Sequence, residues 1–221
     1  MDGFVKFKEK VISSEIVTAY QHVIDGFKYA DGMTGNVLSQ YLYHRLEGAA
    51  DYVTNGAWKK ILEKTAAKLK GKTIEAEPNL ALVDEILKRT ELQTDENLTE
   101  LWARLLANAL QGKNSVRREY FDILEKLNSY DVLVLNAAMD DKYHNYLREI
   151  RKEIKPQYNY QISAPVYSYL DQNYYLKDGM EIILSCKLLK KLEIFSEKIE
   201  VPIFTLTALG EGLKKVLAES E

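Results

Sequence analysis

The sequence predicts a mainly α protein: an N-terminal helical domain over residues 1–116, then a C-terminal α+β domain with a small sheet over residues 117–221. Two observations predict this division. In the first half, apolar residues recur three or four positions apart, which is the period of an amphipathic helix. After Gly112, tyrosines begin to alternate with polar residues, and this period is typical of strands.

Composition sets the broad class. The chain has 221 residues, of which 46% are hydrophobic and 29% charged, so it resembles neither disordered nor fibrous proteins. Its 30 Lys+Arg and 33 Asp+Glu give a net charge of −3, which excludes the polybasic class but still allows a local basic surface. The single Cys186 excludes an intramolecular disulfide and fits a reducing compartment. With no signal-peptide pattern and no uncharged apolar run of ~18–20 residues, we expect a cytoplasmic protein.

Helical periodicity organises the N-terminal half. Helical patterns cover residues 4–29, about 34–53 and 57–69, and Pro78 opens a short one as a first-turn proline. The clearest helix runs from 94 to 110, with Thr94 or Asp95 as its cap. Its apolar stripe comprises Leu98, Leu101, Trp102, Leu105, Leu106 and Ala109. Gly112 and the polar residues after it end this helix, and they mark a domain boundary or hinge.

The C-terminal half mixes helices and strands. Residues 120–127 are amphipathic, and Ser129 is the expected cap of a helix that ends near 139. Alternation predicts strands near 158–162 and 167–169, where Pro165 favours an edge position. A helix over 179–192 and a strand over 201–206 follow. Thr207 then caps a last helix through Leu217.

Motifs for catalysis and cofactors fail on inspection. Residues 70–73 end like a phosphate-binding loop, but Ala66 stands where that loop needs its first glycine. The three histidines form no metal-binding pair, and one cysteine does not make a structural zinc site. We therefore expect no cofactor, no metal and no catalytic residue. Enzymatic activity stays open at this point, since scattered carboxylates could converge in the fold.

A lysine-rich helix covers residues 57–72. Its lysines lie mostly opposite an apolar arc that includes Trp58 and Leu62, and the candidate contact residues are Lys59, Lys60, Lys64 and Lys68. Such a helix can contact phosphate or lie on an anionic membrane. The pattern favours a simpler interpretation, in which the apolar stripe packs on the core and the lysines are solvated.

Tyrosine is concentrated late in the chain. Eight of the 15 tyrosines fall between residues 143 and 175, interleaved with Lys and Arg. Cross-strand pairing in the sheet is the favoured explanation. A protein interface comes second, with Tyr167, Tyr169, Tyr174 and Tyr175 as its candidate residues. Base stacking beside phosphate contacts is the third alternative.

The order of the last elements resembles the end of winged-helix domains. A helix over 179–192 leads into strands and then the phrase Leu206-Thr207-Ala208-Leu209-Gly210. This resemblance makes the C-terminal domain winged-helix-like and implies phosphate contacts by Lys187, Lys190 and Lys191. Winged helices also serve as protein-contact modules. Residues 117–221 hold 15 Lys+Arg against 17 Asp+Glu, and this net charge of −2 disfavours strong DNA binding.

A second resemblance is to the abortive infection alpha family. The phrase Leu101-Trp102-Ala103-Arg104-Leu105-Leu106-Ala107-Asn108-Ala109, its acidic lead-in and a tail at 120–131 are similar to that family, as is Leu206–Gly210. The similarity covers roughly 78–131, with a second anchor near 205–217. The family commonly has a double proline where this chain has Glu77-Pro78, and Ser-Pro where it has Ser129-Tyr130. The resemblance implies a bacterial antiphage protein without an established biochemical activity, and it carries over no catalytic residue.

The residues of this phrase suit a core helix. Trp102 and the leucines supply a stripe to bury, Ala103 and Ala107 allow another helix to approach closely, and Asn108 is expected to hydrogen-bond between helices. We therefore expect an abortive-infection-type protein that binds a protein partner or a second copy of itself. The alternatives are a winged-helix transcriptional regulator that binds DNA and, less favoured, a peripheral membrane protein.

Overall fold

The computed structural model describes residues 57–69, 72, 76, 78–113, 115–142, 145, 171–173, 178–197 and 204–218. Over these residues the protein is mainly helical, which confirms the predicted class at that level. The chain divides into two compact units, Met1–Phe121 and Asp122–Glu221. The domain boundary that we predict at residue 116 stays a prediction.

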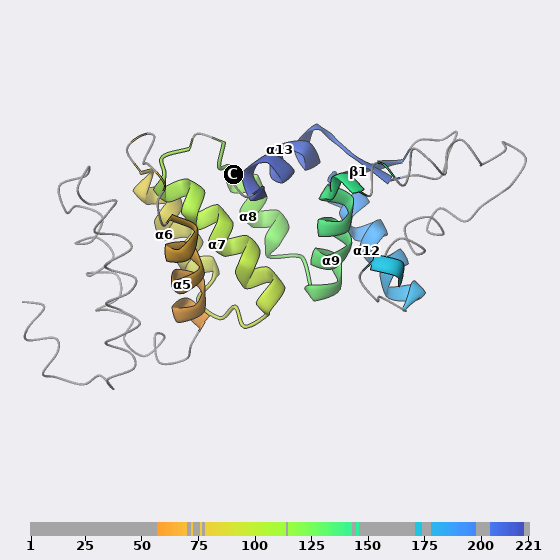
Figure 1. Ribbon diagram of the computed structural model, residues 1–221, viewed down its shortest axis with the longest axis horizontal. Helices are drawn as coiled ribbons and strands as arrows, with labels where there is room; N and C mark the ends of the chain where they lie inside the picture. The colour runs from red at the N-terminus through yellow and green to blue at the C-terminus, as the bar shows by residue number, and fades with distance from the viewer. Residues whose placement is uncertain are drawn as a thin grey trace, which may run out of the picture. The chain divides into compact units, whose positions relative to one another are not determined.

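The described part of unit 1 is built around a buried helix. Helix α7 (Glu96–Leu110) packs against both α5 (Ala57–Leu69) and α6 (Leu80–Arg89), as Figure 1 shows. Only 1% of Trp102 is exposed, and its ring centroid lies 5.9 Å from that of Phe121 in α8 (Arg118–Leu124). The predicted stripe is buried throughout: Leu98, Leu101, Trp102, Leu105, Leu106 and Ala109. The prediction of a core helix centred on Trp102 is therefore confirmed.

Both ends of α7 are fixed by specific hydrogen bonds. At its start, Leu98 N–H donates to Asp95 Oδ1 at 3.0 Å, so Asp95 is the cap and Thr94 is not. At its end, Gly112 N–H donates to the Ala109 carbonyl and Lys113 N–H to the Asn108 carbonyl, which is a Schellman motif. Gly112 has φ +71°, and a Cβ there would lie 2.3 Å from the Ala76 carbonyl oxygen. This position therefore requires glycine.

Two predicted helix starts are wrong by one or two residues. Pro78 is not in the first turn of α6, because Asn79 caps that helix and accepts from Leu82 N–H at 3.3 Å. Likewise Asn128, not Ser129, caps α9 (Ser129–Met139). Asn128 Oδ1 accepts from Asp131 N–H, while Asp131 accepts from Asn128 N–H at 2.8 Å. This reciprocal capping box pairs two backbone donors at the helix start.

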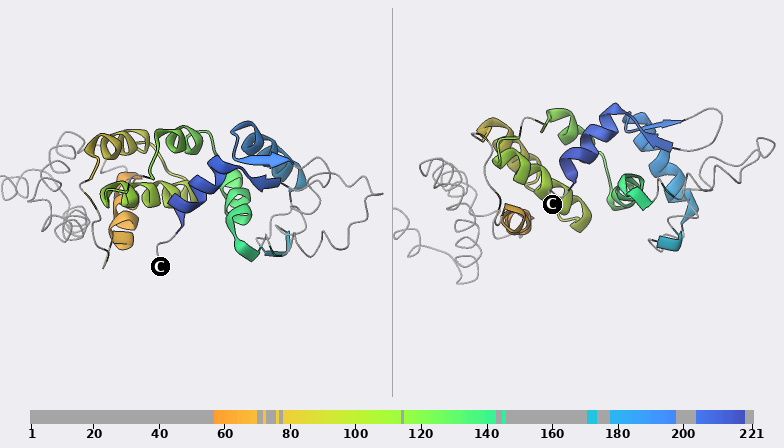
Figure 2. Two further views of the ribbon diagram at one scale, coloured as in Figure 1. Left: turned by 90° about the horizontal axis from the view of Figure 1, so that it is seen from above. Right: turned by 45° about the horizontal axis from the view of Figure 1, so that its top comes forward.

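Unit 2 packs α12 (Gly179–Lys191) against α9 and continues into a short hairpin. Strands β1 (Phe195–Glu197) and β2 (Phe204–Leu206) form the hairpin drawn in Figure 2. They pair antiparallel, with Phe195 opposite Leu206. Helix α13 (Ala208–Leu217) follows, capped by Thr207 as predicted. The strands predicted near 158–162 and 167–169, with Pro165, lie outside the described residues, as do the helices predicted over 4–29 and 34–53.

A backbone clasp joins the end of α12 to the start of α13. The Ile194 carbonyl accepts from Thr207 N–H at 2.9 Å, and the Thr207 hydroxyl donates to the Glu193 carbonyl. A Cβ at Gly210 would lie 2.5 Å from the Ile194 carbonyl oxygen, so only glycine leaves room for it. Thr207 Oγ1 also accepts from Gly210 N–H at 3.1 Å. The phrase at 206–210 thus has a structural explanation.

Helix α12 ends in a second Schellman motif, with a glutamate where glycine is usual. Glu193 N–H donates to the Lys190 carbonyl at 3.0 Å, and Ile194 N–H donates to the Leu189 carbonyl at 2.9 Å. Glu193 has φ 59°, a left-handed conformation in which Cβ crowds the carbonyl of its own residue. The sequence therefore holds local strain at this turn.

We predict that Gly112→Ala lowers the free energy of unfolding by more than about 2 kcal/mol, since it combines left-handed strain with a backbone clash. Urea unfolding followed by tryptophan fluorescence measures it. Gly212→Ala is the control: position 212 lies inside α13, where alanine favours the helix and should be neutral or stabilising. Equal stability of the Gly112 variant and wild type would contradict the assignment.

We also predict that Glu193→Gly raises the free energy of unfolding by about 0.5–1 kcal/mol, because glycine adopts the left-handed conformation without strain. The matched variant Glu193→Ala keeps the Cβ and should change stability little. Thermal unfolding of the three proteins separates backbone strain from a side-chain effect. A gain of the same size in the alanine variant would refute strain as the cause.

Candidate interaction surfaces

Helix α5 contacts α7 at a small residue, Ala103. The buried positions of α5 include Ile61, Leu62 and Thr65. The Thr65 hydroxyl donates to the Ile61 carbonyl at 2.7 Å and also lies 3.4 Å from the Ala103 carbonyl oxygen. Helix α5 therefore approaches the backbone of α7 closely at Ala103, where the side chain is small. The expected role of Ala103 is confirmed.

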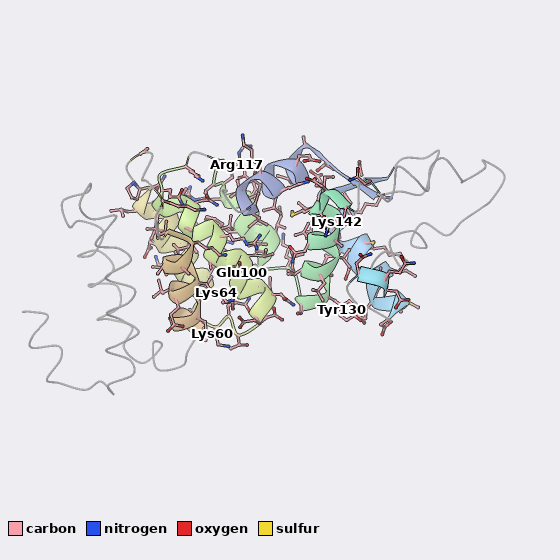
Figure 3. All side chains as sticks on the ribbon, viewed as in Figure 1. Lys60, Lys64, Glu100, Arg117, Tyr130 and Lys142 are labelled. Carbon is pink, nitrogen blue, oxygen red and sulfur yellow. The ribbon has the colours of Figure 1, made fainter. Side chains whose placement is uncertain are left out.

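The lysines of α5 form ion pairs with α7. Lys60 Nζ lies 3.4 Å from Glu96 Oε2, and Lys64 Nζ lies 2.9 Å from Glu96 Oε1 and 3.3 Å from Glu100 Oε2. Lys68 Nζ lies 2.5 Å from Glu100 Oε1. Figure 3 shows Lys64 and Glu100 near one another, with Lys60 at the end of this ladder. The sequence suggested that these lysines are solvated. Lys60, Lys64 and Lys68 instead join two helices through ion pairs.

This ladder perturbs the carboxylate at its centre. Burial alone raises the pKa of Glu100, but hydrogen bonds from Lys68 and from Arg104, whose Nε lies 3.1 Å away, lower that pKa to about 2. Hydrogen bonding to Glu96 raises the pKa of Lys64. The ionised network is therefore the stable form at neutral pH. Membrane or phosphate binding by this helix stays a prediction, and the side chain of Lys59 lies outside the described part of the chain.

The α12 helix presents a second surface. Its buried side comprises Ile182, Ser185, Cys186 and Leu189. On the opposite side Met180 is 64% exposed and Leu184 50%, and Lys187 and Lys191 are exposed as well. At 100° per residue these four side chains fall within an arc of about 60°. We name Met180, Leu184, Lys187 and Lys191 the α12 outer face.

The structure brings together two of the three predicted α12 lysines. Lys187 and Lys191 lie on the outer face, whereas Lys190 is exposed on the adjacent side of the helix. Sequence reasoning missed Met180 and Leu184. The i, i+4 spacing of these two residues is visible in the sequence. Because α12 has apolar residues of its own all around its circumference, the pattern alone does not indicate which side is buried.

The buried polar groups of α12 are the Cys186 thiol and the Ser185 hydroxyl. Burial raises the pKa of the Cys186 thiol to about 12, so the thiol is protonated at neutral pH. The neighbouring Ser185 hydroxyl is buried and has no hydrogen-bond partner among the described residues. Within the described ranges, no group of three or more His, Cys, Asp or Glu is arranged to hold a metal. None of the helices placed there is long and apolar enough to cross a membrane.

The remaining predicted residues have mixed outcomes. Tyr167, Tyr169, Tyr174 and Tyr175 lie outside the described residues, so their interface role stays a prediction. Asn108 Nδ2 donates to the Arg104 carbonyl at 3.0 Å, within α7. One turn back along a helix, an asparagine can reach a backbone carbonyl of its own helix. The hydrogen bond between helices expected for Asn108 stays a prediction.

Comparison with known proteins gives one match. A family model described as abortive infection alpha matches residues 57–210. That range is 154 of the 221 residues, well over half the chain, and it includes both α7 and the clasp. No curated protein and no solved structure matches the chain.

For the ion-pair ladder we predict that Glu100→Gln lowers the free energy of unfolding at pH 7 by about 1–2 kcal/mol. The folded pKa of about 2 lies below the ordinary 4.5, so this contribution is complete above pH 4.5 and is lost as pH falls towards 2. Urea unfolding of both proteins between pH 7 and pH 3 measures the difference.

The control variant is Glu96→Gln, because Glu96 is 60% exposed and its ion pairs are screened by solvent. Its effect should be smaller at every pH. A difference between Glu100→Gln and wild type that stays constant from pH 7 to pH 3 would show that charge is not the source.

Proposed function

Because this chain belongs to the abortive infection alpha family, we propose that it protects bacteria against phage by an abortive-infection-type response and that it acts by binding a partner. The α12 outer face is the observation that carries the binding role. Two large apolar side chains are half or more exposed there, beside two exposed lysines. Exposed large apolar side chains bordered by a polar rim are typical of protein contact surfaces.

The state of the single thiol in unit 2 supports a binding role rather than catalysis by that thiol. Cys186 is the only cysteine of the chain, it is buried, and its raised pKa keeps it protonated. The exposed side chains of α12, by contrast, are suited to contact. We propose that the protein acts in the cytoplasm on a protein partner, or on a second copy of itself.

We further propose that unit 2 is a winged-helix-like module. Its order of elements supports this: α12 runs into an antiparallel β1–β2 ribbon, and α13 follows directly. In this interpretation α12 occupies the place of a recognition helix. The second candidate function is accordingly a DNA-binding regulator, and the observation that favours it is the exposure of Lys187, Lys190 and Lys191 on that helix.

We predict that cells carrying the gene form fewer plaques than cells without it for at least one phage of a broad panel. At low multiplicity of infection the culture should survive, and at high multiplicity infected cells should die before releasing phage. Plating and liquid growth at both multiplicities measure this. Equal plaque counts on both strains across the panel would contradict a defence role.

For the second candidate, a gel shift with duplex DNA at low and high salt is decisive. A regulator should bind tightly at low salt with a steep salt dependence, and the triple variant Lys187→Ala, Lys190→Ala, Lys191→Ala should lose the shift. We expect wild-type protein to give no specific shift. A salt-sensitive shift that the triple variant abolishes would favour the regulator over a protein-binding role.

A further inference from the structure

We propose that the α12 outer face binds an acidic amphipathic helix of a partner protein, which lies antiparallel to α12. This inference rests on the proposed partner-binding function and names the chemistry of the partner. Three features support it. One half of the face is apolar and the other half is basic, both ends of α12 are held by hydrogen bonds, and acidic residues lie at the start of α12 while lysines lie near its end.

The outer face changes character along the helix. Met180 and Leu184 stand at its N-terminal half, and Lys187 and Lys191 at its C-terminal half. With a rise of 1.5 Å per residue, the two apolar positions lie about 6 Å apart along the axis, and the lysines lie about 10 and 16 Å beyond Met180. No ion pair joins Lys187 or Lys191 to any residue in the described part of the chain. A partner therefore needs an apolar contact and, beside it, carboxylates.

The helix that carries this face is held in place before any partner binds. Asp178 caps it by accepting from Met180 N–H at 3.0 Å and from Glu181 N–H at 3.2 Å. Its far end is fixed by the Schellman motif at Glu193 and by the clasp to Thr207. Its inner side is buried and packs on α9. Binding at such a face orders little of this chain, which favours affinity.

Charge sets the direction of the partner. Asp178 and Glu181 lie at the start of α12, and Lys187, Lys190 and Lys191 lie near its end. A helix tolerates acidic residues best in its own first turns, where they meet the positive end of its dipole. An antiparallel helix with acidic first turns thus places its carboxylates against the lysines of α12. Its later turns, with apolar residues at i, i+3 and i+4, meet Met180 and Leu184.

The same features disfavour DNA as the occupant. A recognition helix places its N-terminal residues against the bases, inside a groove lined by phosphates. In α12 that end carries the exposed Asp178 carboxylate and the partly exposed Glu181, together with Met180. Carboxylates at that end repel phosphate. An acidic protein helix meets no such repulsion, because its own acidic turns lie at the opposite end of α12.

The test uses the full chain and three fluorescein-labelled 18-residue helical peptides of one length. The first has glutamates in its first two turns and leucines at i, i+3 and i+4 in the rest. The second carries the same residues in reverse order, and the third has lysine in place of every glutamate. Fluorescence anisotropy should show that the first binds at least fivefold more tightly than the other two.

Variants of the protein localise the binding. Met180→Ser with Leu184→Ser should weaken binding of the first peptide at least tenfold. Lys187→Glu with Lys191→Glu should reverse the preference, so that the lysine peptide binds better than the glutamate peptide. Leu92→Ser is the matched control, since it removes a side chain 79% exposed in unit 1 and should change nothing. Circular dichroism checks that each variant is folded.

Equal binding of all three peptides, no binding of any, or an equal loss in the Leu92 variant would each overturn the proposal. Duplex DNA that competes with the first peptide at physiological salt would also overturn it, in favour of nucleic acid. These outcomes are separate from the plating assay. Plaque protection without peptide binding would refute this inference alone, whereas peptide binding without protection would refute only the defence role.

Discussion

The Ile194 carbonyl is the group on which unit 2 depends. It accepts a hydrogen bond from Thr207 N–H at 2.9 Å, and a Cβ atom at position 210 would lie 2.5 Å from its oxygen. This one contact ties the end of α12 to the start of α13 and sets the register in which Phe195 faces Leu206. The buried side of α12 packs on α9, and this packing leaves the opposite side, with Met180 and Leu184, exposed.

Unit 1 is organised by a different kind of contact. A close approach at Ala103 sets α5 against α7, and the ladder of Lys60, Lys64 and Lys68 with Glu96 and Glu100 runs beside it. The apolar contact supplies most of the stabilisation, since partly exposed ion pairs contribute little individually. The ladder joins the two helices at Glu96 and Glu100. Lysines that the sequence indicates to be solvated thus lie beside the contact between α5 and α7.

The sequence predicted features that depend on local rules. The period of α7, a cap at Thr94 or Asp95 and the cap at Thr207 each follow from a few neighbouring residues, and the structure assigns the first cap to Asp95. The sequence was a poor guide to features that depend on competition between neighbouring residues or on partners distant in the sequence. Asn128 displaces Ser129 as a cap because Asp131 completes a reciprocal pair. The lysines of α5 looked solvated because their partners lie 32 to 36 residues later, in another helix. The sequence pattern does not reveal the outer face of α12, because α12 has apolar residues on all its sides. Packing on α9 decides which of these residues are buried.

We propose that the exposed side of α12 carries the defence function. The measurement that tests it most directly is phage plating on cells that express the double variant Met180→Ser and Leu184→Ser. Wild type and the Leu92→Ser variant are the comparisons, at matched protein levels. We expect the double variant to stay folded and lose protection, and Leu92→Ser to protect as well as wild type. Full protection by a folded double variant would contradict it.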